Sequence, residues 1–415
     1  MSGDADALLA QLDPVVQEFR NDAFCLGEDL KRLNRVRAVK APEAVVLYCG
    51  RALEVLSGSA LLDIKLKPAT QPFSNLLDLE RFNLISPVTL FLAHGLRRVA
   101  NNARHVTRQL ESAEAEAALI YLERWLHWYF CTYRFGPKRP ALAGEAEPFA
   151  LSQDAPLREF VAQLEAEDLP NAELQSLTRN CGAIWQHSAS VAAILAEMLI
   201  ERREFKLATQ VLDSAQETFR NDLRLTQLRA LWFSRNGRPD EAVRLLQEAS
   251  EDDETLGIRG GALKRLWEKD CKRARLEECY SAYCNGWDKS KGANVYLGIN
   301  AATTALWLER KQKAQEIAAK VRELLEKRQA AIAQLHGALS LGFWDQVTLA
   351  EARLLLGDFD AARTAYNAAF GRGGEKISNM DVAKEQARKI LLAQGKTAEE
   401  AAKFFDEAPE SAPPM

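Results

Sequence analysis

The chain has 415 residues, of which 47% are hydrophobic and 27% are charged, and its formal net charge is −4. This length suffices for two or three domains that each bury a core, and we expect no membrane span because no apolar run approaches the roughly 18 residues that one needs. The slightly negative charge argues against a nucleic-acid binder that works by bulk electrostatics. Any contact with RNA is therefore expected at a local basic patch.

The cysteines indicate a reducing compartment. There are seven, an odd number, and none lies in a Cys-x-x-Cys pair. No basic and apolar signal peptide opens the chain, so we expect free thiols in the cytoplasm. Cys279 and Cys284 lie five residues apart with no histidine nearby, which does not favour a zinc site, and we expect no metal.

Three helices are expected in the first 105 residues. Their apolar periodicity places them at residues 2–40, 42–58 and about 88–105, and the second has a proline in its first turn. Arg51 and Glu54 lie three residues apart in the second helix. The interpretation we favour is a surface pair within that helix, rather than a part of a catalytic site.

The third helix contains the most chemically loaded stretch of the sequence, Leu96 to His105. Arg98 and His105 are seven residues apart, so they share a helical face about 10 Å apart along the axis, with Asn101 and Asn102 between them. Such a face suits a phosphodiester, because arginine neutralises charge on phosphoryl oxygens and histidine transfers a proton near neutral pH. The alternative interpretation is a solvated helical face on which the histidine has an ordinary structural partner.

Three motifs occur between Ala41 and His105. They are Arg51-Ala52-Leu53-Glu54, Phe73-Ser74-Asn75-Leu76-Leu77, and an Arg-x4–6-His pattern that Arg98 and His105 match. Together they resemble the HEPN superfamily of all-helical domains, in a bacterial branch. The resemblance implies a helical bundle that acts as a dimer and, in active members, cleaves RNA without a metal through the arginine and the histidine. Other members of the branch are non-catalytic.

An aromatic segment from Ala113 to Phe135 is predicted to be helical. Its aromatic side chains fall largely on one face, and they include Tyr121, Trp125, Trp128 and Tyr129. A stripe of this kind is more often core or a subunit interface than a platform for stacking bases. Because the HEPN resemblance implies a dimer, we predict an interface and a homodimer through the N-terminal domain.

A repeat follows a linker at residues 136–156, which holds four prolines and two glycines. Beyond Gln186, alanines recur in pairs twelve residues apart, and the first two pairs are offset by 34 residues, the period of tetratricopeptide repeats. The pairs are Ala196 and Ala208, Ala230 and Ala242, Ala302 and Ala314, and Ala350 and Ala362. Small residues at such positions let two antiparallel helices approach closely. Because the later offsets are irregular, we expect a repeat array with a specialised middle.

Three short motifs mark that middle: ETLG at 254–257, YLGIN at 296–300 and WD at 344–345. With their surroundings from Ser190 to Phe370, they resemble a sensor-like repeat domain called TPR-S. That domain occurs in bacterial conflict systems and is similar to the region adjoining the TRAF-binding part of apoptosis signal-regulating kinases. The resemblance implies a nucleotide-derived ligand on the concave side of the repeats.

The residue types of this region fit such a ligand. Glycines at 257, 260 and 261 allow close approach of a ligand or of another helix. The candidate ligand-binding residues are cations for phosphate, an amide for a base or ribose edge and aromatic rings for stacking, namely Arg259, Lys264, Arg265, Asn300, Trp267, Tyr296 and Trp344. The alternative is that the glycines serve helix packing, the aromatic residues form the repeat core and the charges are solvated.

The sequence has no GxGxxG or Walker-type loop, which argues against an ATPase or a dinucleotide dehydrogenase, and we expect no cofactor.

The sequence thus predicts an all-α protein. We expect an HEPN-like helical bundle at 1–140, a linker with connecting helices at 141–185, a tetratricopeptide-like α-solenoid at 186–405 and a disordered tail at 406–415. The functional hypothesis is a bacterial defence effector in which the repeats sense a nucleotide signal and the dimeric HEPN-like domain is a metal-independent ribonuclease. The alternative is a non-catalytic, ligand-sensing adaptor that acts through protein contacts of the repeats.

Overall fold

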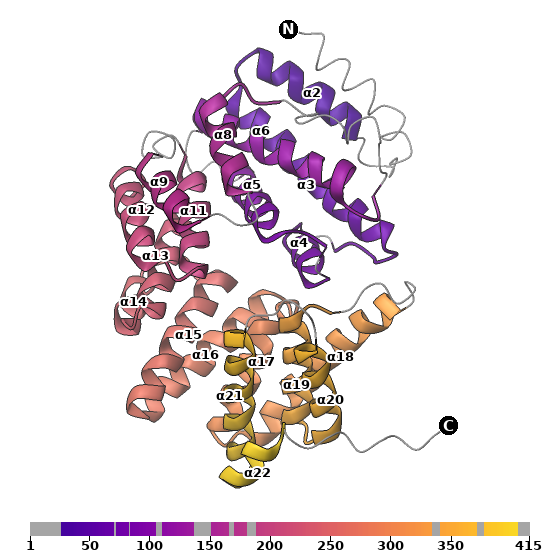
Figure 1. The fold of residues 1–415 in the computed structure, drawn as a ribbon, viewed down its shortest axis with the longest axis vertical. Helices are drawn as coiled ribbons and strands as arrows, with labels where there is room; N and C mark the ends of the chain where they lie inside the picture. Colours follow the sequence, from indigo (N-terminus) through magenta and orange to yellow (C-terminus); the bar gives the residue numbers. More distant parts are fainter. Residues whose placement is uncertain are drawn as a thin grey trace. The chain divides into compact units, whose positions relative to one another are not determined.

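The computed structural model describes residues 26–69, 72–82, 84–104, 110–136, 151–165, 170–180, 188–333, 341–371 and 377–405. Throughout these ranges the regular structure is helical and no strand occurs, which confirms the predicted all-α fold (Figure 1). The predicted tail at 406–415 lies outside the described residues.

The chain divides into two compact units, Met1–Leu228 and Arg229–Met415. The division falls within helix α13 (Leu223–Arg235), whereas the sequence placed the start of the repeat array at about residue 186. Helices α11 (Ala189–Glu201) and α12 (Phe205–Thr218) therefore group with the first unit. The physical reason is that α11 packs on both α12 and α5 (Pro87–Arg104).

The first unit is built around helix α3 (Pro42–Asp63), which contacts α2, α4, α5 and α6. Its remaining helices are α2 (Leu26–Ala38), α4 (Pro72–Arg81), α6 (Ser112–His127), the π-helix η1 (Trp128–Thr132), α8 (Ala155–Leu164) and α9 (Asn171–Asn180). By length and composition alone α3 is apolar enough to cross a membrane, contrary to our expectation that no such run exists. However, 61% of its most apolar window is buried inside the protein, as in the core helix of a globular unit, so this is weak evidence for a span.

The aromatic stripe of α6 and η1 is part of the core of the first unit. Trp125 and Trp128 stack with ring centroids 4.5 Å apart, and Trp128 Nε1 donates a hydrogen bond to Leu84 O at 3.1 Å. The Tyr129 hydroxyl donates to Asp63 Oδ2 at 2.9 Å. The prediction that this stripe forms a dimer interface is therefore wrong, because the rings are buried inside the unit and Trp128 and Tyr129 bond to partners of the same unit.

The predicted surface pair of Arg51 with Glu54 is also wrong. Arg51 instead bonds to Asp29 of α2 through two nitrogens, at 2.9 and 3.2 Å. Glu54 accepts a hydrogen bond from Arg104 at the end of α5. Each residue thus joins α3 to a different neighbouring helix, which spacing within one helix does not reveal.

The second unit is a succession of helices in which each packs on the next along the chain, from α14 to α20. They are α14 (Pro239–Leu245), α15 (Asp253–Asp270), α16 (Arg273–Lys289), α17 (Val295–Trp307), α18 (Lys311–Ala333), α19 (Phe343–Leu355), α20 (Phe359–Phe370), α21 (Ile377–Ala393) and α22 (Ala398–Lys403). Helices α17, α19 and α21 also contact one another, so alternate helices form a layer. This is the arrangement that tetratricopeptide-like repeats predict.

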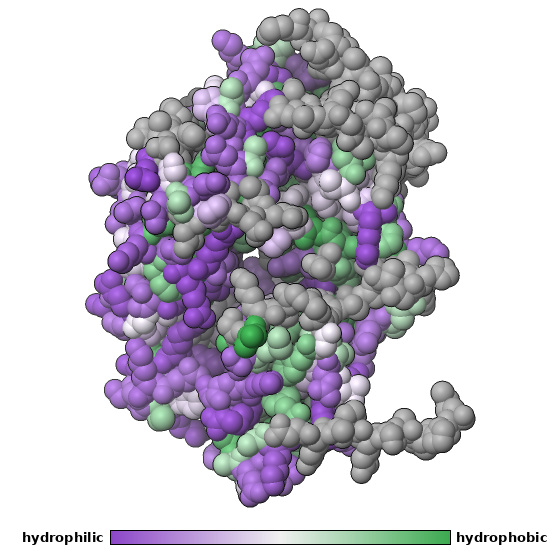
Figure 2. Space-filling view, in the orientation of Figure 1, coloured by the Kyte–Doolittle hydropathy of each residue, from purple (hydrophilic) through white to green (hydrophobic). Residues whose placement is uncertain are grey.

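The alanines that predicted the repeat are buried where helices meet. Ala302, Ala314, Ala350 and Ala362 are each at most 1% exposed, and Ala230 and Ala242 belong to one core cluster. On the face displayed in Figure 2, hydrophobic residues gather over α19 and α21. Three of the exposed apolar side chains lie on α21, Ile377, Val382 and Leu392.

Among the described residues, each unit buries a glutamate whose pKa is raised to about 7, chiefly by burial. In the first unit, the Glu123 carboxylate accepts hydrogen bonds from the Ser152 backbone and from Arg158 Nη2. In the second unit, Glu351 is 8% exposed and forms no hydrogen bond or ion pair with any residue of the described ranges. The positive charge of the Lys264 ammonium opposes the rise in the Glu351 pKa.

We predict that Glu351→Gln removes a pH dependence of stability from the second unit. A carboxyl group with a pKa near 7 in the folded chain and a lower one when unfolded contributes stability fully below the unfolded pKa, and this contribution is lost as the pH rises to 7. At pH 8 the variant should therefore unfold at a higher temperature than the unmodified protein, with a gain on the order of 2 kcal/mol, and at pH 5 the difference should shrink. Thermal unfolding followed by circular dichroism measures both.

Glu123→Gln is the matched control, because the Glu123 carboxylate has a similar pKa but is bonded to its neighbours. That variant should unfold at a lower temperature at pH 8. A lower unfolding temperature for Glu351→Gln at pH 8 would contradict the account of an unpaired buried carboxylate.

Candidate functional site

The predicted catalytic face lies on α5, where the structure describes Arg98, Asn101 and Asn102 but not His105, which lies outside the described residues. Arg98 Nη2 is 3.7 Å from Glu197 Oε2 on α11, and its side chain is 19% exposed. Glu197 also binds Arg224 Nη2 at 2.5 Å. Arg98 thus takes part in an ion-pair network between helices, and it is not a solvated cation.

A second histidine, His94, lies one turn before Arg98 on α5. Its pKa is held well below the usual value by burial and by the nearby arginines 97, 98 and 224, so the imidazole is neutral at physiological pH. Sequence reasoning did not single out His94, Glu197 or Arg224. Glu197 and Arg224 lie about a hundred residues beyond α5, and spacing along one helix gives no signal for them.

In the second unit, side chains from α15, α16 and α17 lie close to Gly261, and Ser234 of α13 bonds to one of them. Arg265 Nη1 donates to Ser234 Oγ at 3.0 Å and to Gly261 O at 3.1 Å. A Cβ atom at Gly261 would lie 3.5 Å from Arg265 Nη1, 3.7 Å from the Tyr283 hydroxyl and 3.9 Å from the Tyr296 hydroxyl. We call Ser234, Gly261, Arg265, Tyr283, Tyr296 and Asn300 the Gly261 cluster.

The Gly261 cluster combines buried and accessible groups. Tyr283 is buried and meets Tyr296 edge to face, with ring centroids 6.2 Å apart, whereas Tyr296 is 52% exposed. Asn300 follows one turn later on α17 and donates from Nδ2 to Tyr296 O at 2.9 Å. Arg265 is exposed. An exposed cation and a half-exposed aromatic ring therefore lie together beside a residue without a side chain, and the amide of Asn300 lies one turn from Tyr296 on the same helix.

The three glycines of α15 have different roles. A Cβ at Gly260 would lie 2.8 Å from the Tyr283 ring, and one at Gly257 would lie 3.1 Å from Leu297 Cδ2, so both serve helix packing. A Cβ at Gly261 would meet nothing closer than 3.5 Å. The packing interpretation thus holds for Gly257 and Gly260, and Gly261 leaves room for a side chain.

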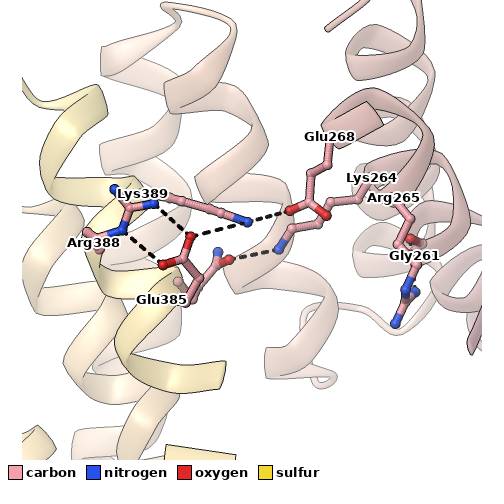
Figure 3. Close-up of polar contacts among 8 residues, drawn as sticks. Gly261, Lys264, Arg265, Glu268, Glu385, Arg388 and Lys389 are labelled. Atoms are coloured by element: carbon pink, nitrogen blue, oxygen red, sulfur yellow. Dashed lines mark hydrogen bonds and ion pairs between the residues drawn. The ribbon is translucent and has the colours of Figure 1, made fainter. Parts of the chain in front are cut away.

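Lys264 and Trp267 do not join this cluster. Lys264 Nζ donates to Gln386 Oε1 of α21 at 2.9 Å and lies 5.1 Å from the centroid of the Trp307 ring. Burial lowers the pKa of its ammonium group. Trp267 stacks on Trp307, with centroids 4.8 Å apart. Figure 3 shows Lys264 and Arg265 leaving α15 in different directions, although they are consecutive residues.

The other two predicted residues also have separate surroundings. Arg259 Nη1 lies 3.6 Å from Glu251 Oε1. Trp344 is 50% exposed and meets Phe343 edge to face. Of the seven predicted ligand-binding residues, the structure thus brings Arg265 and Tyr296 together beside Gly261, and Asn300 contacts the backbone of Tyr296. Among the described residues, no group of three or more histidine, cysteine, aspartate or glutamate side chains is placed to hold a metal ion.

Comparisons with known proteins bear on the repeat region. No curated protein matches the chain. Among solved structures, the crystal structure of yeast Tom70 is similar with a TM-score of 0.38 and 12% sequence identity, over 98% of this chain and 82% of that one. Residues 204–305 match the family model described as Tetratricopeptide Repeats-Sensor (TPR-S), and this interval contains the whole Gly261 cluster.

Proposed function

We propose that the protein is a sensor whose repeats bind a nucleotide-derived ligand at the Gly261 cluster. The observation that carries the proposal is the convergence of Arg265 and Tyr296, from two helices, over Gly261. A guanidinium binds phosphate in a fixed planar geometry, an accessible aromatic ring stacks on a base, and the Asn300 amide offers both donors and an acceptor. The TPR-S match over this interval supports a sensing role.

The alternative occupant of the same surface is a protein partner. Repeats of this kind present extended surfaces to other proteins, and the TPR-S match fits that use as well. The small-ligand proposal is preferred because the group over Gly261 is compact and polar. A small ligand would be detected in a screen of nucleotides, whereas a protein partner would be detected only in a search for binding proteins.

The output that we propose for the first unit is cleavage of RNA by Arg98 and His105, in a bacterial defence response, as the HEPN resemblance implies. The arrangement of Arg98 sets a condition on this proposal. Its guanidinium must stabilise charge on a phosphoryl oxygen of the RNA while it lies 3.7 Å from Glu197 Oε2. A non-catalytic adaptor has no such requirement.

A homodimer through the first unit would need a surface other than the aromatic stripe, which is buried.

A ligand panel tests the sensor. Cyclic nucleotides and ADP-ribose derivatives should include at least one that raises the unfolding temperature, because a ligand present at a hundredfold its Kd stabilises the folded state by about 2.7 kcal/mol. Arg265→Glu should abolish that shift, and Gly261→Ala should weaken it because the added methyl group fills the space over the helix. Lys313→Glu on α18, whose side chain is 54% exposed, is the control that should keep the shift.

Two results would count against the sensor. One is a panel in which no compound changes the unfolding temperature. The other is a shift that persists undiminished in Arg265→Glu.

RNA cleavage is tested by His105→Ala, assayed with total RNA in the presence and absence of a ligand from the panel. If the histidine transfers the proton of a 2′-hydroxyl, the variant should lose a factor of about 10² to 10⁴ in rate, and the products should end in 2′,3′-cyclic phosphate without added metal. Arg98→Ala should also lose activity, but it should in addition lower the unfolding temperature because Glu197 loses a partner. Cleavage that continues unchanged in His105→Ala would rule out this site.

A further inference from the structure

Arg265 is anchored through one nitrogen, which leaves its other donors unused. Nη1 donates to Ser234 Oγ at 3.0 Å and to Gly261 O at 3.1 Å. Within the described ranges, Nε and Nη2 bond to no residue and the guanidinium forms no ion pair. The anchored side chain therefore presents a planar pair of N–H donors and a positive charge without a counterion in this part of the chain. A planar pair of this kind binds two oxygens of a phosphate at once.

Two phenol hydroxyls lie beside this guanidinium. The point at which a Cβ of residue 261 would stand is 3.5 Å from Arg265 Nη1, 3.7 Å from the Tyr283 hydroxyl oxygen and 3.9 Å from that of Tyr296. Polar atoms from α15, α16 and α17 thus lie around one point on the surface of α15. Hydroxyls and a guanidinium donate hydrogen bonds, and none of the three groups carries a negative charge. The point therefore suits an anionic acceptor.

The two consecutive glycines of α15 make this arrangement possible. A Cβ at Gly260 would lie 2.8 Å from Cε1 of the Tyr283 ring, so the ring fits there only against glycine. At Gly261 the nearest atom of the same ring system is the hydroxyl oxygen, and no Cβ covers it. A methyl group at residue 261 would fill the space in which an acceptor meets the two hydroxyls.

The Tyr283 phenol keeps its proton. Burial, and after it the neighbouring Tyr296, raise the pKa of Tyr283 well above the ordinary value of a phenol. The hydroxyl therefore donates at any physiological pH and does not repel an anion. Because the Arg265 guanidinium is also permanently charged, the same donors face a ligand throughout the neutral range.

We propose that the Gly261 cluster binds a terminal phosphate group, and that the hydroxyls of Tyr283 and Tyr296 make it specific for that group. The proposal rests on the proposed function for the nucleotide to which the phosphate belongs. A terminal phosphate offers three free oxygens as strong acceptors, whereas the phosphodiester of a cyclic nucleotide offers two. Arg265 Nε and Nη2 bind two of these oxygens, and the tyrosine hydroxyls bind the third.

Two inorganic probes separate the phosphate from the rest of a nucleotide. Pyrophosphate consists of terminal phosphates, whereas trimetaphosphate is a closed ring of phosphates without a terminal group. Isothermal titration calorimetry of the full chain should give a dissociation constant for pyrophosphate at least roughly tenfold lower than that for trimetaphosphate, the factor that corresponds to losing one hydrogen bond to a charged group. Equal affinity for the two probes, or no binding of pyrophosphate, would overturn the proposal.

Three substitutions of tyrosine by phenylalanine, each of which removes only a hydroxyl, assign the contact. Tyr283→Phe and Tyr296→Phe should each weaken pyrophosphate binding by roughly tenfold and bring the affinities for the two probes closer together. Tyr366→Phe on α20 is the matched control. Its hydroxyl is also buried in the second unit but has no hydrogen-bond partner among the described residues, so its removal should leave binding unchanged.

Tyr296→Phe keeps the test decisive if Tyr283→Phe does not fold, because Tyr296 is half exposed and its hydroxyl is not part of the core. Circular dichroism shows which variants are folded. A folded Tyr283→Phe or Tyr296→Phe variant that binds pyrophosphate as tightly as Tyr366→Phe does would contradict the assignment of the hydroxyls.

The phosphate site and the proposed function fail separately. If pyrophosphate binds with the expected dependence on the tyrosines but no compound of the nucleotide panel binds, the sensor proposal is wrong and the phosphate site stands. If a cyclic nucleotide binds and Arg265→Glu abolishes its effect, while pyrophosphate does not bind, the phosphate site is wrong and the sensor stands.

Discussion

The close approach of α15, α16 and α17 through glycines determines the rest of the second unit. A Cβ at Gly298 would lie 2.8 Å from both the Trp287 ring and Val321 Cγ2, and one at Gly286 would lie 2.9 Å from Leu297 Cδ1. Together with the Tyr283 ring against Gly260, these contacts fix the spacing and the register of three helices. Tyr296 and Arg265 reach the same place only because their helices are this close.

The polar residues of α15 face two different neighbours. Consecutive residues of a helix point about 100° apart, so Arg265 faces the Gly261 cluster while Lys264 faces α21. One rigid helix therefore joins an accessible polar surface to a partly buried ionic contact. A ligand that moves or restrains α15 acts on both, which is the physical basis for sensing in this account.

Much of this architecture follows from the sequence, and the errors have a common cause. The alanine pairs identified the helical repeat because the small residues that helix crossings require recur at a regular spacing in the sequence. The aromatic periodicity correctly indicated that Trp125 and Trp128 are buried, but periodicity does not say by what, and the partner is the unit's own core. The pairing of Arg98 with Glu197 joins positions a hundred residues apart, so no local pattern could reveal it. Arg265 and Tyr296 were singled out from the sequence and lie beside Gly261, whereas the places of Ser234 and Tyr283 follow only from the packing.

The most direct test of the account is a hydrogen-exchange comparison of the full chain with and without a nucleotide that binds it. Binding at the Gly261 cluster should slow exchange of backbone amides in residues 257–265 of α15 and 295–300 of α17, since ordering of Arg265 and Tyr296 restrains both helices. The same ligand should leave α18 unchanged. Protection confined to α18 or to the first unit would contradict the claim that this protein senses its ligand where Arg265 and Tyr296 meet over Gly261.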